Sequence, residues 1–352
     1  MLRTLRHAAL TTTCVLATGT LSLAAAAESV VPAEAAWTVR MNVADAFDSP
    51  IGDILLDRAR RQFTSFDDTM DNLEQTLGFD PRESIGSAVL YGDRPGRGEV
   101  ALVADLVGGR GKLEGWMLAM PGYQSEDLDD QTLLHSFLLG EGGPEGRPRG
   151  RADRDGNRAE RAEGRGAERP RRDRPGRGPE RVFITLPGTA DGGTRLVASL
   201  MRDQALEATQ ALASGEADLD ADALPAGRLL AAKLNRIPDR AMRPQDPGSA
   251  VLQSLEEAEL TLGSAENISM ELDLGATTPA RARQLAQLLT GLQGLAGLLA
   301  MEQPELQTLV TTLQGIDVRS NDGSRDVSAR LDLSTAQFEQ ALDTLLDLAP
   351  QE

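Results

Sequence analysis

Apolar and polar residues alternate most regularly between residues 256 and 275. Ala258, Leu260 and Leu262 are separated by acidic or hydroxyl residues, and the alternation resumes over residues 268–274 after a short turn. A period of two is typical of an antiparallel hairpin that buries one face and exposes the other. The predicted polar face of this hairpin consists of Glu257, Glu259, Thr261, Ser269, Glu271 and Asp273.

A long helix is predicted directly after this hairpin. Thr278 followed by Pro279 is typical of a helix N-cap and first turn. Leucines then recur at spacings of three and four residues, which is the period of a helix with an apolar stripe. These leucines are Leu285, Leu288, Leu289, Leu292, Leu295, Leu298 and Leu299. We expect this helix to cover the apolar face of the hairpin.

A shorter version of the same arrangement follows. The pattern predicts a helix at 304–313, strands at 316–320 and 327–333, and a final helix at 335–348. The two strands are joined by Asn321-Asp322-Gly323, and Asp-Gly between alternating runs strongly favours a tight hairpin turn.

The N-terminal part of the chain repeats this order of elements. Its predicted elements are a strand at 37–43, helices at 50–63 and 66–77, strands at 87–92 and 99–107, a helix at 113–120, strands at 133–139, 182–186 and 194–200, and a helix at 203–213. A strand predicted at 228–237 then starts the second series, which indicates an internal duplication. The predicted fold is α+β with two similar halves, residues 28–220 and 221–352. Each half is expected to be an antiparallel sheet of hairpins with helices packed on one face.

Residues 1–27 have the features of a secretory signal peptide. Arg3 and Arg6 precede a mostly apolar segment at 8–23, and Ala25-Ala26-Ala27 fits a small-x-small cleavage site. The alternative is a membrane anchor, but this segment contains five threonines and is shorter than the ~20 apolar residues that a membrane span needs. We therefore expect export to the periplasm or the extracellular space, cleavage after Ala27, and a mature chain without a transmembrane segment.

The composition restricts the chemistry of the mature chain. Cys14 and His7 both lie in the predicted signal peptide, so the mature protein would keep no cysteine and one histidine, His135. This excludes disulfides, cysteine nucleophiles and zinc sites built on Cys or His pairs. The formal net charge of −18 marks a strongly acidic protein, and only 3% of residues are aromatic, so its cores must consist mainly of Leu, Val and Ala.

A segment of different composition interrupts the first half at residues 141–181. It consists almost wholly of Arg, Gly, Pro, Glu, Asp and Ala, and residues 145–181 contain 13 arginines against 8 acidic residues. Without apolar residues it cannot form a core, and we expect a disordered loop. Its candidate polyanion contacts are Arg147, Arg149, Arg151, Arg169, Arg171, Arg172 and Arg174.

Three interpretations of this loop remain open. It can be a passive insertion at a hairpin tip, where extra length costs little closure entropy. It can instead contact an envelope polyanion or a protein partner through its arginines. A third interpretation is that the loop folds onto the acidic surface of its own chain or of a neighbouring molecule.

No catalytic motif is found. Residues 108–112 superficially suggest a phosphate-binding loop, but Leu106 and Leu113 occupy positions that require Gly and Ser or Thr. His135 alternates with Leu133 and Phe137 in a predicted strand, which favours a part-buried, hydrogen-bonded histidine over a general base.

The acidic clusters are weak candidates. Asp218, Asp220 and Asp222 have the spacing of a calcium loop, but Ala223 and Leu229 replace the required Gly and Glu, so we interpret them as a solvated linker. Two other clusters could supply a carboxylate pair for sugar hydrolysis. They are Asp67, Asp68 and Asp71, and the pair Asp129 and Asp130.

These observations predict an exported, non-enzymatic protein that binds a ligand or partner, or has a structural role in the envelope. No cofactor or metal is expected. The candidate contact surfaces are the Arg-rich loop and the sheet face of Glu257, Glu259, Glu271 and Asp273. The alternative is a carboxylate-based hydrolase in which His135 assists.

Overall fold

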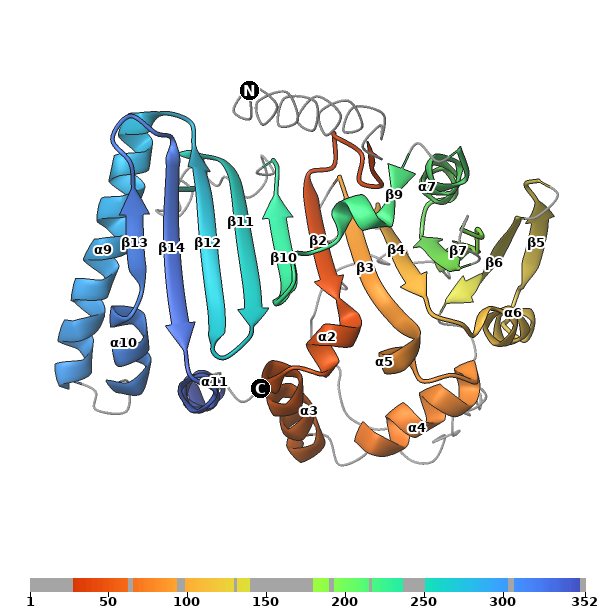
Figure 1. The fold of residues 1–352 in the computed structure, drawn as a ribbon, viewed down its shortest axis with the longest axis horizontal. Helices are drawn as coiled ribbons and strands as arrows, with labels where there is room; N and C mark the ends of the chain where they lie inside the picture. The colour runs from red at the N-terminus through yellow and green to blue at the C-terminus, as the bar shows by residue number, and fades with distance from the viewer. Residues whose placement is uncertain are drawn as a thin grey trace, which may run out of the picture.

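A computed structural model describes the chain at residues 28–62, 66–93, 99–129, 132–139, 180–189, 193–214, 217–236, 251–302 and 307–348. Within these residues twelve strands form one open antiparallel sheet (Figure 1). From one edge to the other the order is β13 (Asp317–Ser320), β14 (Asp326–Leu333), β12 (Ile268–Ala276), β11 (Leu255–Ser264), β10 (Arg228–Leu234), β2 (Trp37–Asn42), β3 (Ile85–Gly92), β4 (Val100–Leu106), β8 (Thr194–Ser199), β7 (Glu180–Thr185), β6 (Leu133–Leu139) and β5 (Gln124–Asp127).

The α+β class and the antiparallel hairpins agree with the prediction, but the division into two sheets is wrong. Strands β2 and β10 pair directly, with Trp37 opposite Leu234 and Met41 opposite Leu230. In a separate sheet each of these strands would leave one edge unpaired, and pairing the two edges satisfies backbone groups that would otherwise be exposed. The sheet therefore runs without interruption from one half of the chain into the other.

The strands of the two halves follow the same order outward from this central pair. The first half reads β2, β3, β4, β8, β7, and the second reads β10, β11, β12, β14, β13. The first half continues beyond β7 with β6 and β5. Strand β6 was predicted with the observed bounds, whereas the short and fully exposed β5 was missed because it lacks apolar alternation.

The register of the strand pairs defines two faces of the sheet, because directly paired residues project to the same side. Face 1 carries, from β12 to β4, Leu272, Leu260, Ala232, Val39, Leu90 and Leu102. Face 2 carries, over the same strands, Glu271, Thr261, Ala231, Arg40, Val89 and Val103.

Helices cover face 1 in both halves. In the second half, helix α9 (Pro279–Glu302) packs Ala282 and Leu285 against Leu274 and Val327. In the first half, α2 (Val43–Phe47) and α6 (Arg110–Leu118) pack on apolar side chains of β3, β4 and β6. The Thr278 hydroxyl accepts a hydrogen bond from the Arg281 N–H at the start of α9, so the predicted N-cap is confirmed.

Face 2 is also covered in the first half, so the prediction of helices on one face is wrong there. Helix α7 (Arg202–Ser214), residues 28–36, the short strands β1 (Glu28–Ser29) and β9 (Ala217–Asp218), and the 3-10 helix η1 (Leu219–Asp222) form this second layer. Its core contains Val89, Val103 and Val197. Strands β3 and β4 are apolar at most positions of both alternations, as in sheets that are buried on both sides.

Several helices lie at one end of the strands (Figure 1). They are α3 (Pro50–Gln62), α4 (Phe66–Leu77), α5 (Pro81–Ser84), α10 (Gln307–Gln314) and α11 (Thr335–Leu348). Ile51 of α3 packs with Leu229 and Ile268 of the second half, and Phe338 of α11 joins this cluster. An ion pair between Arg58 and Asp343 links the same two helices, so the halves contact each other outside the sheet as well.

Candidate functional site

The polar face is face 2 of the five strands of the second half, β10, β11, β12, β14 and β13. It looks toward the viewer in Figure 1, and no described helix crosses it there. Acidic, basic and hydroxyl side chains occupy it: Arg228, Lys233, Glu257, Glu259, Thr261, Ser269, Glu271, Asp273, Asp317, Arg319, Ser328, Arg330 and Asp332. The four acids predicted as sheet-face contacts all lie on this surface, as the alternation indicated.

Ion pairs connect many of these side chains. Their N···O distances are 2.9 Å for Lys233–Glu257, 3.2 Å for Arg228–Glu271, 2.9 Å for Arg330–Asp332 and 2.5 Å for Arg319–Asp317. Pairs as exposed as these each contribute about 0.2–1 kcal/mol to stability. Their main effect is to neutralise the face locally, although the whole chain is strongly acidic.

Two acids on the polar face stand directly opposite each other. Glu259 pairs in register with Asp273, so two like charges share adjacent positions. The pKa of Asp273 is raised, first because partial burial removes water from its carboxylate and then because Glu271 and Glu259 repel a second negative charge.

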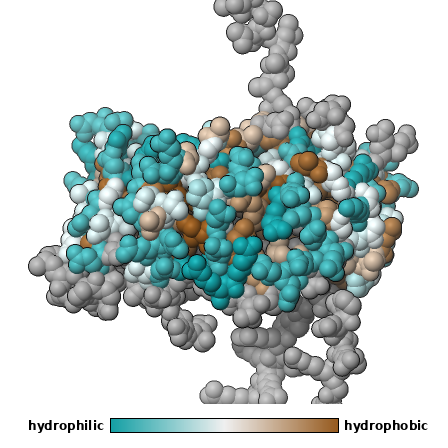
Figure 2. All heavy atoms as spheres, turned by 60° about the horizontal axis from the view of Figure 1, so that its bottom comes forward, coloured by the Kyte–Doolittle hydropathy of each residue, from teal (hydrophilic) through white to brown (hydrophobic). Residues whose placement is uncertain are grey.

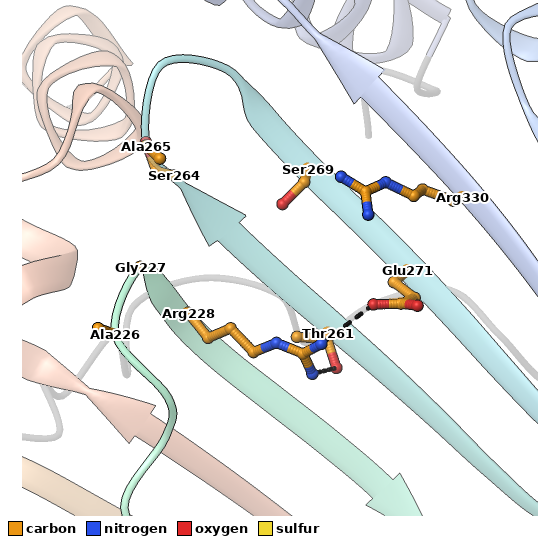
Figure 3. Close-up of a pocket in the computed structure, with 9 residues that line it drawn as sticks. All are labelled: Ala226, Gly227, Arg228, Thr261, Ser264, Ala265, Ser269, Glu271 and Arg330. Atoms are coloured by element: carbon orange, nitrogen blue, oxygen red, sulfur yellow. Dashed lines mark hydrogen bonds and ion pairs between the residues drawn. The ribbon is translucent and has the colours of Figure 1, made fainter.

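A shallow hollow lies in the polar face at the end of β11 (Figure 3). The register places Arg228, Gly263, Ser269 and Asp332 in one row across four strands. Beside this row the face opens into a hollow of about 230 Å³. The residues around it are Ala226, Gly227, Arg228, Thr261, Ser264, Ala265, Ser269, Glu271 and Arg330.

The walls of the hollow are polar. The Arg228 guanidinium donates to Thr261 Oγ1 at 3.4 Å and to Glu271 Oε2 at 3.2 Å, which are both long bonds. From the other side, the Arg330 side chain extends along the sheet toward Ser269 (Figure 3). Arg330 itself is held by two hydrogen bonds to Asp332, at 2.9 and 3.1 Å.

Sequence reasoning did not identify Arg228 or the hollow. A register shift between Arg228 and Leu230 breaks the alternation of β10, so the side on which Arg228 projects does not follow from a period of two. Gly263 was expected in the turn, whereas β11 continues to Ser264. The one sequence signal at this place was a glycine between two alternating runs, because glycine inside a strand often marks the close approach of another group.

The seven candidate arginines of the Arg-rich loop, from Arg147 to Arg174, lie outside the described residues. The strands on either side of the loop do pair, with Leu139 opposite Glu180, so its predicted position at a hairpin tip is confirmed. Arg181, at the base of this hairpin, donates to Gln124 Oε1 at 3.0 Å and to Ser136 Oγ at 2.9 Å.

His135 is buried, as predicted, with 3% of its surface exposed. It projects from β6 on face 1, and its Nδ1 lies 2.9 Å from the Tyr123 hydroxyl oxygen. Burial lowers its pKa; Arg110 lowers it further and Glu114 raises it. No described carboxylate hydrogen-bonds to His135.

The acidic clusters lie apart from His135. Asp129 accepts a hydrogen bond from the Thr132 N–H, and Asp67 pairs with Arg60 at 3.0 Å. Asp68 and Asp71 are exposed on α4, and Asp130 lies outside the described residues.

The interpretation of Asp222 as part of a solvated linker is wrong. Its side chain is fully buried between η1 and face 2 of the first half. It accepts hydrogen bonds from Ser29 Oγ at 2.7 Å, the Val30 N–H at 2.9 Å and Arg40 Nη2 at 3.0 Å. Apolar neighbours such as Leu219 draw this segment onto the sheet, and Asp222 then fixes residues 29 and 30 beside it.

Comparison with known proteins identifies no relative: no family model, no curated protein and no solved structure matches this chain. Among the described helices, none is long and apolar enough to cross a membrane. The described residues also contain no group of three or more His, Cys, Asp or Glu side chains that could hold a metal ion.

Proposed function

We propose that this chain is an exported, non-enzymatic binding or envelope-associated structural protein whose contact surface is the polar face. One observation carries the proposal. Face 2 is buried under α7, η1 and residues 28–36 in the first half, whereas the same face is open and hydrophilic in the second half. Hydrophilic residues also dominate the described surface in Figure 2, with smaller apolar groups between them.

An internal duplication would account for this difference. The proposal is supported by the matching order of the first five strands outward from the central pair in the two halves, residues 28–220 and 221–352. By chain order, α11 is the counterpart of α7, because each helix follows the last strand of its half. However, α11 packs against α10, α3 and β14, and its Phe338 joins a cluster with Ile268 of face 1. Face 2 of the second half is thereby left without the helix that covers it in the first half.

Export is proposed from the signal-type segment at residues 1–27. A mature chain without cysteine suits an oxidising compartment, since it cannot form wrong disulfides there. An open polar surface on a rigid sheet is suited to recognition, because strands hold contact residues more precisely than loops do.

Crosslinking in intact host cells, followed by mass spectrometry, tests the contact surface. The test variant replaces Glu257, Glu259 and Asp273 with Ala and keeps Glu271, because Glu271 also lines the hollow. A matched control replaces three exposed acids of α3 and α4, which are Asp53, Asp68 and Glu74. We expect crosslinked products of the native protein to persist in the control and to fall at least fivefold in the test variant.

Equal products from both variants would exclude the polar face as the contact surface. A third variant, in which a short turn replaces residues 144–179, tests the Arg-rich loop as a second surface. The pairing of Leu139 with Glu180 allows such a turn to close the hairpin. Products that disappear only in this variant, and that weaken steeply with salt, would assign the contact to the loop.

A further inference from the structure

Gly263 lies in the row beside the hollow, and the groups packed against its backbone leave no room for a side chain. A Cβ atom at this position would lie 2.8 Å from Ser269 Oγ and 2.9 Å from the Gly227 carbonyl oxygen. The φ angle of Gly263 lies outside the left-handed region, so the backbone conformation does not require glycine. Glycine inside a strand costs stability, and it often marks a place where another group approaches the backbone closely.

The groups around the hollow offer both donors and acceptors of hydrogen bonds. The guanidinium groups of Arg228 and Arg330 donate, and the Glu271 carboxylate accepts. Ser269 and Thr261 carry hydroxyls that do both.

Each positive charge of the hollow already has a carboxylate beside it. Arg228 pairs with Glu271 at 3.2 Å, and Arg330 pairs with Asp332 at 2.9 Å. Because these exposed pairs leave the hollow without net charge, a charged ligand gains little electrostatic attraction there. A neutral ligand with several hydroxyls can instead donate to Glu271 and accept from the arginines while both pairs stay intact.

We propose that the hollow binds one ring of a neutral saccharide. Its volume of about 230 Å³ corresponds to roughly seven water molecules, which is enough for a sugar ring and its hydroxyls. Because the hollow is shallow and has no aromatic platform, binding is in the millimolar range, which corresponds to about −4 kcal/mol. The inference rests on the proposed function, since it names the ligand class of the polar face.

Saturation-transfer NMR on the purified protein tests the proposal. The probes are glucose, mannose, galactose and N-acetylglucosamine, each titrated separately, with inorganic phosphate as the anionic probe. We expect saturation transfer to at least one sugar and an affinity at least tenfold lower in Ser269→Val, whose branched side chain narrows the hollow. Gly263→Ala forces Ser269 and Gly227 to shift at the wall of the hollow and provides a second test, with circular dichroism to confirm that it folds.

Ser328→Val is the matched control, because Ser328 lies on the same face but outside the hollow. Its sugar affinity should equal that of the native protein. The proposal is overturned if none of the four sugars binds, if Ser269→Val binds sugar as the native protein does, or if phosphate binds in their place. The crosslinking variant retains every residue of the hollow, so failure of sugar binding and failure of the contact surface are separate outcomes.

Discussion

The neighbours of an acidic side chain determine how well the fold accommodates it. Asp222 is fully buried, and a hydroxyl, a backbone N–H and a guanidinium donate hydrogen bonds to its side chain. Asp273 has the opposite surroundings, because its direct neighbour is Glu259. The surroundings of the two aspartates therefore differ: hydrogen-bond donors face Asp222, whereas another carboxylate faces Asp273.

The raised pKa of Asp273 leads to a prediction about stability and pH. A folded carboxyl with a raised pKa binds its proton more tightly than the unfolded chain does, so the native protein loses stability as the pH rises through that range. Asp273→Asn removes the charge and should raise Tm at pH 7. The gain should disappear near pH 3, where the native Asp273 is itself protonated.

Thermal unfolding at both pH values, in low and high salt, measures this effect. The gain at pH 7 should shrink in high salt, because part of it comes from repulsion between exposed acids. Asp71→Asn, an exposed acid on α4, controls for the change in net charge alone. A Tm for Asp273→Asn that is unchanged or lower at pH 7 would contradict the account of the pKa.

At the level of elements, helix α9 has two apolar sides with different exposure. Leu285 is buried against the sheet with 4% of its surface exposed, whereas Leu292 is 53% exposed. Both belong to the leucine series that predicted the helix, so the spacing alone does not show which leucines form the core. The buried side is selected by contact with Leu274 and Val327 of the hairpin.

Alanine substitutions should separate the two sides of α9. Leu285→Ala leaves a cavity between helix and sheet and should lower the free energy of unfolding by about 2–4 kcal/mol. Leu292→Ala, at a solvent-facing position of the same helix, should change it by less than about 0.5 kcal/mol. Urea unfolding followed by circular dichroism measures both, and similar losses for the two variants would contradict this orientation of α9.

The elements that the sequence predicts well are those with one buried face. The hairpin of β11 and β12, the helix after it and the Asp-Gly turn were all located. In these elements an exposed polar side alternates with a buried apolar side, so the structural period appears in the sequence. Strands β3, β4 and β8 were also located, but their double burial was not recognised, and so α7 was expected on the wrong side. In the candidate site, the acids followed from alternation, whereas Arg228 did not, because the bulge beside it resets the register.

The whole molecule is organised by the joint between its two halves, which is the pairing of β2 with β10. The alternation of apolar and polar residues within each strand does not predict this pairing. Both strands look like the first strand of a separate sheet, and nothing in either pattern specifies the other as its partner. The joint is supported beyond the sheet by Ile51, which packs on Leu229 and Ile268 of the other half. A continuous sheet and a shared cluster predict that the two halves unfold together.

Ile51→Ala tests this cooperativity. Ile51 is 3% exposed, and its truncation should cost about 2–4 kcal/mol. Both tryptophans, Trp37 and Trp116, belong to the first half, so their fluorescence reports that half, while far-UV circular dichroism reports both. In a cooperative molecule the two signals have one urea midpoint, and Ile51→Ala lowers both midpoints equally.

Leu55→Ala is the control for this experiment, because Leu55 lies on the same helix but is 49% exposed. It should leave both midpoints nearly unchanged. If Ile51→Ala instead separated the circular dichroism transition from the fluorescence transition, the halves would be independent folding units that merely share an edge. The polar face would then belong to a domain that can be studied alone, whereas coincident transitions mean that its geometry depends on the first half as well.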